Sequence, residues 1–229
     1  MKAPMILDCT LRDGSYVNNF QFSKDETSEI SRDLDKAGFQ YIEVGHGIGL
    51  GATERGQYVA ACSDEEYMKA ASESVKNNKW GMFCIPGIAS LDHIKIAADH
   101  GMNFIRIGTD VTEVDQSEEF IDLALKNNIE VFSNFMKSYV LEPREFANLV
   151  SKAKDFGAQM VYLVDSAGGM LPNEVKSFIT AAQDLNPDVP LGFHGHNNLG
   201  LGVANALICA ELGVEMIDTS LQGYGRSAG

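Results

Sequence analysis

The feature that most constrains the fold is a regular alternation of short apolar runs with longer amphipathic runs along the chain of 229 residues. The apolar runs are continuous, which is typical of strands covered on both faces and favours a parallel sheet. They predict β-strands at Met5–Leu11, Tyr41–Gly45, Gly81–Ile85, Phe104–Ile107, Glu130–Asn134, Met160–Asp165, Leu191–His194 and Met216–Ser220.

The segments between these strands have the spacing of amphipathic helices. Two of them begin with a capping box, Ser23 with Glu26 and Ser63 with Glu66. The predicted helices are Lys24–Ala37, Ser63–Lys76, Leu91–Asp99, Ser117–Lys126, Pro143–Phe156, Asn173–Asp184 and Leu201–Glu211. Eight strands with helical crossovers predict an α/β fold, a (β/α)8 TIM barrel. A doubly wound open sheet is the alternative, and it is disfavoured because no point of reversal is visible.

We expect one barrel domain over residues 1–229. The chain ends at Gly229, shortly after the eighth predicted strand, whereas a complete barrel carries a further helix there. The pattern therefore predicts a barrel truncated after its eighth strand, with an apolar flank that would favour self-association. The glycine-rich segment 46–62 follows the second strand, where barrels carry active-site loops, and its glycine spacing does not fit a dinucleotide-binding motif.

Composition narrows the classes of partner. The chain has 18 basic and 32 acidic residues, a formal charge of −14, which disfavours binding to nucleic acid or to an anionic membrane surface. No apolar stretch has the length of a signal peptide or a membrane span. The four cysteines are far apart and form no CxxC pair, which indicates reduced thiols and a cytoplasmic protein.

Two motifs near opposite ends of the chain carry the chemistry. His194 and His196 are two residues apart on a predicted strand, so both imidazoles point to the same side. A closed barrel brings the ends of its first and seventh strands together, and Asp13 then adds a carboxylate. This mixed nitrogen and oxygen set suits Mn²⁺ or Mg²⁺, with Zn²⁺ or Fe²⁺ as alternatives. The competing interpretations are a chance His-x-His pair and a turn aspartate before Gly14.

The run Asp8–Gly14 together with His194–His196 resembles the DRE-TIM metallolyases, the superfamily of HMG-CoA lyase. The sequence is most similar to the 4-hydroxy-2-oxovalerate aldolase branch. The similarity extends to Glu43–Gly47, to Val164–Gly168 and to the stretch 194–210, in order along the whole chain. The resemblance implies a metal-dependent aldolase that cleaves a 4-hydroxy-2-oxo acid, a small molecule, to pyruvate or an analogue plus an aldehyde. It also implies a homodimer.

The resemblance assigns roles to individual residues. Asp13, His194 and His196 match the metal ligands of the family, and Arg12 matches the arginine that stabilises the enolate. Charge that develops on an oxygen during carbon–carbon cleavage is stabilised by a divalent ion and a guanidinium. Ser166 matches a residue that contacts the substrate carboxylate. The alternative role of Ser166 is to cap the next helix. The alternative role of Arg12 is to form an ion pair with Asp8 or Glu43.

Three further residues are expected around the pocket. Glu43 is expected to orient Arg12. His46 could donate a proton or hold the glycine-rich loop, and the second role is favoured. Asn134 ends the fifth predicted strand, where it lines the pocket or caps a helix.

The sequence also departs from the branch that it resembles. Tyr16 stands where the branch has a histidine, the general base, and an ordinary tyrosine pKa near 10 is high for that task. Without the helical extension of the branch, a partner dehydrogenase stays an open question. A Claisen-type synthase joining an acyl-CoA to a 2-oxo acid is an alternative, disfavoured because Glu-Gln does not follow Gly14. A catalytically inactive barrel that serves as a binding module is the other alternative.

Overall fold

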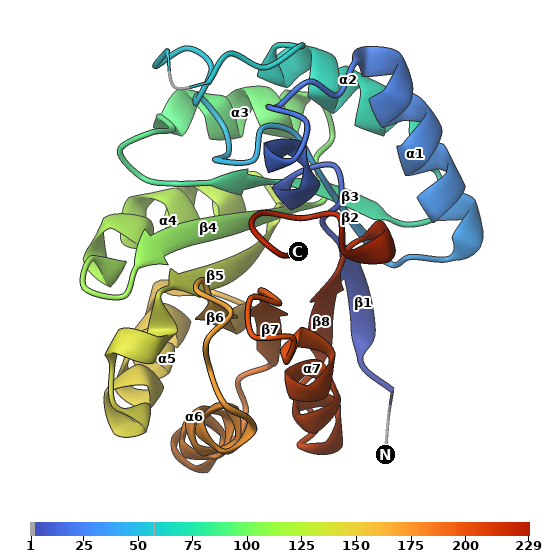
Figure 1. Cartoon of the computed structure of the whole chain (residues 1–229). Coiled ribbons are helices and arrows are strands. Elements are labelled where there is room, and N and C mark those ends of the chain that lie inside the picture. The colour runs from blue at the N-terminus through green and yellow to red at the C-terminus, as the bar shows by residue number, and fades with distance from the viewer. Residues whose placement is uncertain (1–2, 57) are drawn as a thin grey trace.

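The computed structural model describes residues 3–56 and 58–229, so Met1, Lys2 and one position of the predicted loop, Gln57, lie outside it. Eight parallel strands pair in chain order and close into a barrel, which confirms the TIM-barrel prediction and excludes the open sheet (Figure 1). The strands are β1 (Met5–Asp8), β2 (Tyr41–Val44), β3 (Lys79–Cys84), β4 (Phe104–Asp110), β5 (Glu130–Met136), β6 (Met160–Asp165), β7 (Leu191–Gly195) and β8 (Met216–Thr219).

Seven α-helices of the described chain surround the barrel. They are α1 (Lys24–Ala37), α2 (Asp64–Ser74), α3 (Leu91–Asp99), α4 (Glu118–Lys126), α5 (Pro143–Phe156), α6 (Pro172–Leu185) and α7 (Gly202–Glu211). Both capping boxes are present as predicted. The prediction of the first strand was too long at its C-terminal end. The carbonyl of Cys9 accepts hydrogen bonds from the backbone N–H groups of Arg12 and Asp13, and this turn ends the strand.

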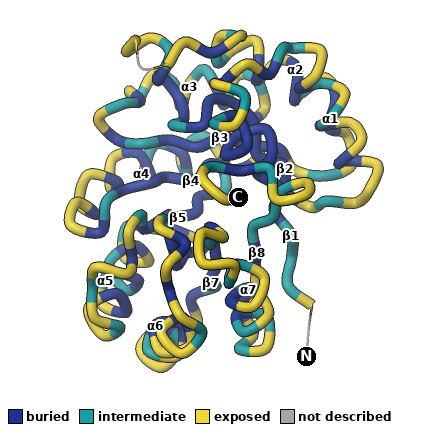
Figure 2. The backbone as a smooth tube through the Cα atoms, in the orientation of Figure 1, coloured by how far each residue is buried: buried dark blue, intermediate teal, exposed yellow. Residues whose placement is uncertain are grey.

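Each strand presents one face to the helices and the other to the barrel interior. Outward residues such as Ile42, Ile105 and Leu163 join the core between strands and helices. Inward residues near the amino ends of the strands form a separate apolar cluster, with Tyr41 and Phe104 among its members. Figure 2 shows β2 to β7 largely buried, β1 and β8 partly buried, and the outer sides of the helices exposed. Burial on both faces explains the continuous apolar runs of the sequence.

The segment after β8 folds across the carboxyl ends of the strands, where Figure 1 places the C-terminus over the barrel centre. The N–H of Asn197 donates to the carbonyl of Gly229 at 2.6 Å. Gly14 lies under the same segment, and a Cβ there would come within 2.7 Å of the Tyr224 carbonyl oxygen. The last described residues therefore form one wall of whatever site the barrel holds.

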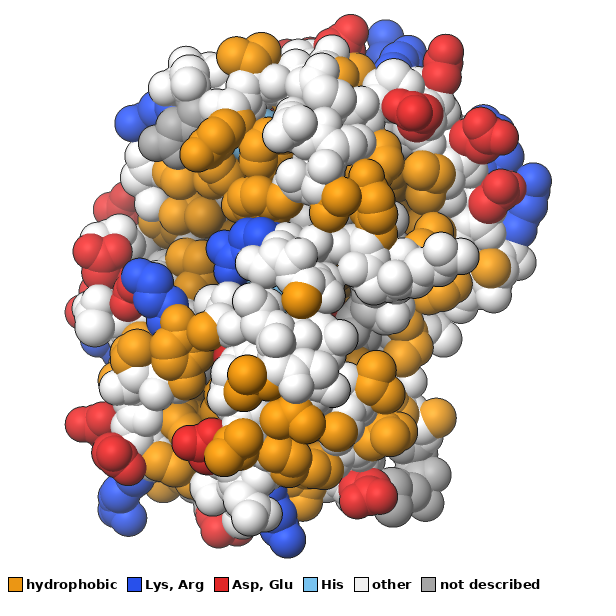
Figure 3. All heavy atoms as spheres, in the orientation of Figure 1, with side chains coloured by type: hydrophobic (Ala, Val, Ile, Leu, Met, Phe, Trp, Pro, Cys, Tyr) orange, Lys and Arg blue, Asp and Glu red, His pale blue; other side chains and the backbone are white. Residues whose placement is uncertain are grey.

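An apolar groove of about 710 Å³ runs beside β8 and α7, and it includes Phe193, Leu207 and Ile217. Figure 3 shows apolar side chains gathered over α7. Within residues 3–56 and 58–229, the structure has no α-helix between α7 and α1 around the barrel. None of the helices in this described part combines the length and the apolar character of a bilayer span.

Candidate active site

The three predicted metal ligands meet at the carboxyl end of the barrel. Asp13 lies in the 3-10 turn after β1, His194 is the penultimate residue of β7, and His196 directly follows that strand. One potential ligand atom from each lies within 4.8 Å of the other two, and all three residues are buried. The imidazole centroids are 5.1 Å apart, and His196 Nδ1 is 4.0 Å from Asp13 Oδ2. The three residues are close enough together to hold one metal ion between them.

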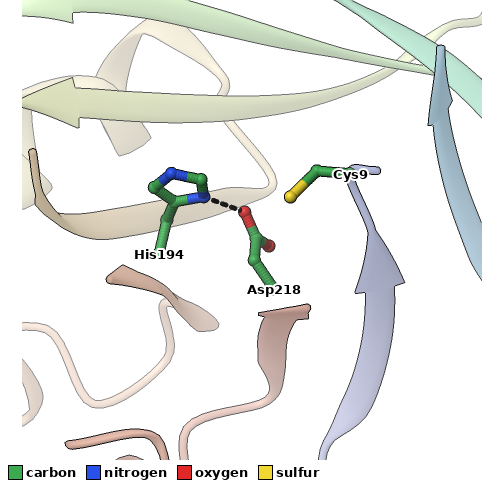
Figure 4. Close-up of side chains that lie close together, drawn as sticks. All are labelled: Cys9, His194 and Asp218. Atoms are coloured by element: carbon green, nitrogen blue, oxygen red, sulfur yellow. Dashed lines mark hydrogen bonds and ion pairs between the residues drawn. The ribbon is translucent and has the colours of Figure 1, made fainter. Parts of the chain in front are cut away.

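A carboxylate of β8 fixes the orientation of His194. Its Nδ1 lies 2.6 Å from Asp218 Oδ2, so that Nε2 is left as the potential ligand atom (Figure 4). Cys9 lies beside this pair, but its thiol donates to the carbonyl of Thr219 and burial raises its pKa. A carboxylate behind a histidine ligand is a common way to fix both the ring and its tautomer.

A chain of buried ion pairs continues from Asp218 through the barrel interior. Arg106 pairs with Asp218 and, at 2.6 Å, with Glu43. Glu43 also accepts from Arg12 Nε at 2.7 Å, and Arg12 Nη1 donates to Asp13 at 2.9 Å. This series of ion pairs thus connects two candidate metal ligands, Asp13 at one end and His194, next to Asp218, at the other. Of the two ion-pair partners considered for Arg12, Glu43 is the one present.

The charges set the protonation states of these groups. Burial alone would raise the pKa of Asp13, but Arg12 and the two imidazoles lower it, and the net pKa lies well below the ordinary value. Burial, reinforced by His194, lowers the pKa of His196 to about 4. At neutral pH the site therefore holds an ionised carboxylate and an uncharged His196, the forms that bind metal ions.

A small cavity of about 70 Å³ adjoins these residues, and its walls include Tyr16, Asn134 and Ser166. Burial raises the pKa of Tyr16, so its hydroxyl is protonated at neutral pH. The Ser166 hydroxyl accepts from the N–H of Lys137 at 3.0 Å. The helix-capping alternative for Ser166 is wrong, because α6 begins after Leu171. Asn134 lies within β5, so it caps no helix.

His46 does not line this cavity in the described structure. Its Nε2 lies 2.7 Å from the carbonyl oxygen of Tyr58, and its Nδ1 accepts from the N–H of Ile48 at 3.1 Å. Its ring also stacks on Phe20, with centroids 4.2 Å apart. These contacts match the loop-holding role and leave neither nitrogen free for substrate.

Three residues of the site escaped the sequence analysis. Arg106 and Asp218 are single charged residues within predicted apolar strands. Their charge at inward positions of those strands was the one signal in the sequence that could have found them. Arg226 lies in the segment after β8, outside any motif. Its N–H donates to Asp13 at 3.0 Å, and its guanidinium donates to the carbonyl of Ser166 at 2.9 Å.

Comparison with known proteins gives a family match over almost the whole chain. The family model described as HMGL-like matches residues 3–229. The chain is 40% identical to "Oxaloacetate decarboxylase" of Mycobacterium tuberculosis over 100% of its own length and 67% of the relative. It is 41% identical to "4-hydroxy-2-oxovalerate aldolase 2" of Rhodococcus jostii over 98% of its length and 65% of that relative. The chain thus spans about two thirds of the length of these proteins.

Solved structures share the barrel. The N-terminal domain of a candidate aldolase from Bacteroides vulgatus superposes with a TM-score of 0.81 at 27% identity, over 98% of this chain and 75% of that one. The carboxyl transferase domain of Rhizobium etli pyruvate carboxylase, solved with oxamate and biotin, gives a TM-score of 0.84. At 17% identity, over 98% of this chain and 41% of the other, it shows the fold alone. With a family match over nearly every residue, the chain belongs to the HMGL-like family of lyase enzymes.

Proposed function

We propose that this protein is a divalent-metal-dependent aldolase. It cleaves the C3–C4 bond of a 4-hydroxy-2-oxo acid and yields pyruvate or an analogue plus an aldehyde. The observation that carries the proposal is the environment of Arg12. Its Nε and Nη1 are held by carboxylates, whereas its buried Nη2 has no hydrogen-bond partner in the described structure and Arg12 lines the cavity.

The residues present fit a divalent cation. Asp13, His194 and His196 would hold it, and Mn²⁺ or Mg²⁺ suits a set that contains no thiolate, with Zn²⁺ as the alternative. When bound, the ion supplies a Lewis acid that polarises the 2-oxo group and stabilises negative charge on its oxygen.

The side chains of the pocket supply the remaining interactions. Arg12 donates from Nη2 to the keto oxygen, on which charge accumulates as the carbon–carbon bond breaks. Glu43 and Asp13 hold the guanidinium in place, so no reorganisation is needed during the reaction. The Ser166 hydroxyl binds the C1 carboxylate. Asn134, whose buried Oδ1 is unpaired among the described residues, contacts a hydroxyl of the substrate.

Tyr16 takes a role different from that of the histidine in similar enzymes. Its raised pKa makes the phenol a donor and a poor base at neutral pH. We assign Tyr16 to the protonation of the enolate carbon, the step that forms the methyl group of pyruvate. The proton that the C4 hydroxyl releases to water as the aldehyde forms restores the phenol. Proton transfer by a positioned side chain typically contributes about 10²- to 10⁴-fold to a rate.

Exchange of the methyl hydrogens of pyruvate for deuterium, followed by NMR, tests this chemistry. We expect exchange that requires Mn²⁺ or Mg²⁺ and falls by roughly 10²-fold or more in Arg12→Lys and Tyr16→Phe. Arg32→Lys, a matched change at an exposed position of α1, should exchange at the wild-type rate. No exchange with any divalent ion would contradict the proposal and favour a barrel that only binds.

Decarboxylation of a 2-oxo diacid is the second candidate, favoured by the 40% identity to a protein named oxaloacetate decarboxylase. Loss of carbon dioxide from oxaloacetate leaves the same pyruvate enolate, so Arg12 would act in the same way. Assays of carbon dioxide from oxaloacetate and of aldehyde from 4-hydroxy-2-oxo acids distinguish the two. Aldehyde release at the higher kcat/KM supports the aldolase, and the reverse order identifies a decarboxylase.

A further inference from the structure

Arg226 lines the cavity beside His196. Its guanidinium Nη2 donates to the Ser166 carbonyl oxygen at 2.9 Å and lies 3.4 Å from His196 Nε2. The guanidinium carbon is 5.8 Å from the centroid of the Tyr16 ring. The side chain therefore lies near residues that follow β6, β7 and β1, beside the candidate metal ligand His196.

The guanidinium of Arg226 has no carboxylate partner. The Ser166 carbonyl oxygen accepts from it, His196 Nε2 lies 3.4 Å away, and among the described residues no carboxylate lies within 4.0 Å of the guanidinium nitrogens. Arg12, in the same pocket, pairs with both Asp13 and Glu43. A partly buried guanidinium without a counter-ion is suited to bind a carboxylate, which it can do with two parallel hydrogen bonds.

The charge of the whole site points to the same class of ligand. Three carboxylates, Asp13, Glu43 and Asp218, and three guanidiniums, Arg12, Arg106 and Arg226, belong to the cavity and the ion-pair chain behind it. The charges of these six groups cancel, so a bound divalent ion adds a net charge of +2. A 2-oxo monoacid brings one negative charge, whereas a 2-oxo diacid brings two. Unbalanced charge in a buried site is costly, and the diacid leaves none.

We propose that Arg226 binds the distal carboxylate of the substrate and selects 2-oxo dicarboxylates over 2-oxo monoacids, an inference that rests on the proposed function. A cavity of about 70 Å³ holds about two water molecules, so the guanidinium moves outward to admit a diacid. The distal carboxylate then replaces the Ser166 carbonyl as its partner.

Two unreactive probes test this selection. 2-Oxoglutarate and 2-oxovalerate share a five-carbon skeleton and differ only by a terminal carboxylate or methyl group. Isothermal titration of the Mn²⁺-loaded protein should show 2-oxoglutarate binding roughly tenfold or more tighter than 2-oxovalerate. Arg226→Gln should bring the ratio of the two affinities close to one, and Arg226→Lys should keep part of it.

Lys137→Gln is the matched control. It also removes a positive charge from the carboxyl face, but the Lys137 ammonium pairs with Asp110 and does not line the cavity. The wild-type ratio should persist in this variant, and its loss would show that general charge, and not Arg226, selects the ligand.

The outcomes separate the two proposals. Equal affinities of the wild type for the two probes, or an unchanged affinity ratio in Arg226→Gln, overturn the role of Arg226. If the protein still binds Mn²⁺ and 2-oxovalerate, the proposed function stays intact. A wild-type protein that binds no Mn²⁺ by electron paramagnetic resonance overturns both.

Discussion

The two ends of the barrel interior are built from the same strands but hold opposite kinds of side chain. At the amino end, Tyr41 and Phe104 pack with ring centroids 5.2 Å apart in an apolar cluster. Two residues further along the same strands, on the same inward face, stand Glu43 and Arg106, an ion pair that is fully buried. A distance of two residues along each strand thus separates the apolar cluster from the buried ion pairs.

The two ends of the barrel interior therefore have different roles in the fold. The aromatic cluster fills the barrel mainly by packing. The ion pairs at the carboxyl end connect Arg12, Asp218 and His194, so each charge fixes the position of the next. Buried charges are tolerated only when paired, which makes this end sensitive to single changes. In TIM barrels the carboxyl end holds the active site.

The largest effect should come from Arg106→Met. The change leaves the buried Glu43 and Asp218 without their shared cation, which should cost about 3–5 kcal/mol of unfolding free energy. Urea denaturation of the metal-free protein measures it. Arg106→Lys keeps the charge but loses the hydrogen bonding to both carboxylates, so its unfolding free energy should lie between those of the wild type and Arg106→Met. A loss below about 1 kcal/mol in the methionine variant would show that the pairs are not coupled.

Asp218→Asn should act mainly on metal binding. An amide holds His194 less firmly than a carboxylate does, so Mn²⁺ affinity should fall by about 10- to 100-fold. Titration followed by electron paramagnetic resonance measures the change. Asp92→Asn, at an exposed pair with Lys95, is the control and should bind Mn²⁺ as the wild type does. Equal affinity in both variants would remove Asp218 from the site.

Phe132→Leu tests the amino end. Phe132 is buried beside Phe104, with centroids 5.6 Å apart, and the smaller side chain should cost about 1–2 kcal/mol of stability. Mn²⁺ affinity should stay within about twofold, because effects at separated sites are nearly independent. A large loss of Mn²⁺ binding would mean that the two ends do not act separately.

The smallest effect should follow Lys79→Met. Lys79 also pairs with a carboxylate of the barrel, Glu130, but its side chain is 46% exposed at the amino end. The loss of this pair should change stability by less than about 1 kcal/mol, in contrast to the buried pairs. Thermal unfolding checks this, and a change as large as that of Arg106→Met would undermine burial as the cause of the difference.

Periodicity and capping residues predicted most of the fold. Lys24–Ala37, Leu91–Asp99 and Pro143–Phe156 are helices with the predicted bounds. These elements depend on local signals, such as the serine before α1 and the glycine after α5. The end of the first strand was missed because a turn around the Cys9 carbonyl, a backbone feature, ends it.

The site was only partly visible in the sequence. His194 and His196 could be placed on one side because strand parity is a local rule, and the closed barrel brought Asp13 to them. Which charges pair inside a barrel depends on register between strands, so Arg106 and Asp218 carried no local signal of their partners. Arg226 reaches the cavity only because the segment after β8 turns back over the barrel.

Anomalous scattering from crystals soaked in Mn²⁺ shows whether Asp13, His194 and His196 share one cation. We expect one strong peak bounded by these three residues, and its loss in His196→Asn. A map in which Mn²⁺ binds elsewhere, or in which these three side chains surround no peak at saturating Mn²⁺, would contradict this expectation.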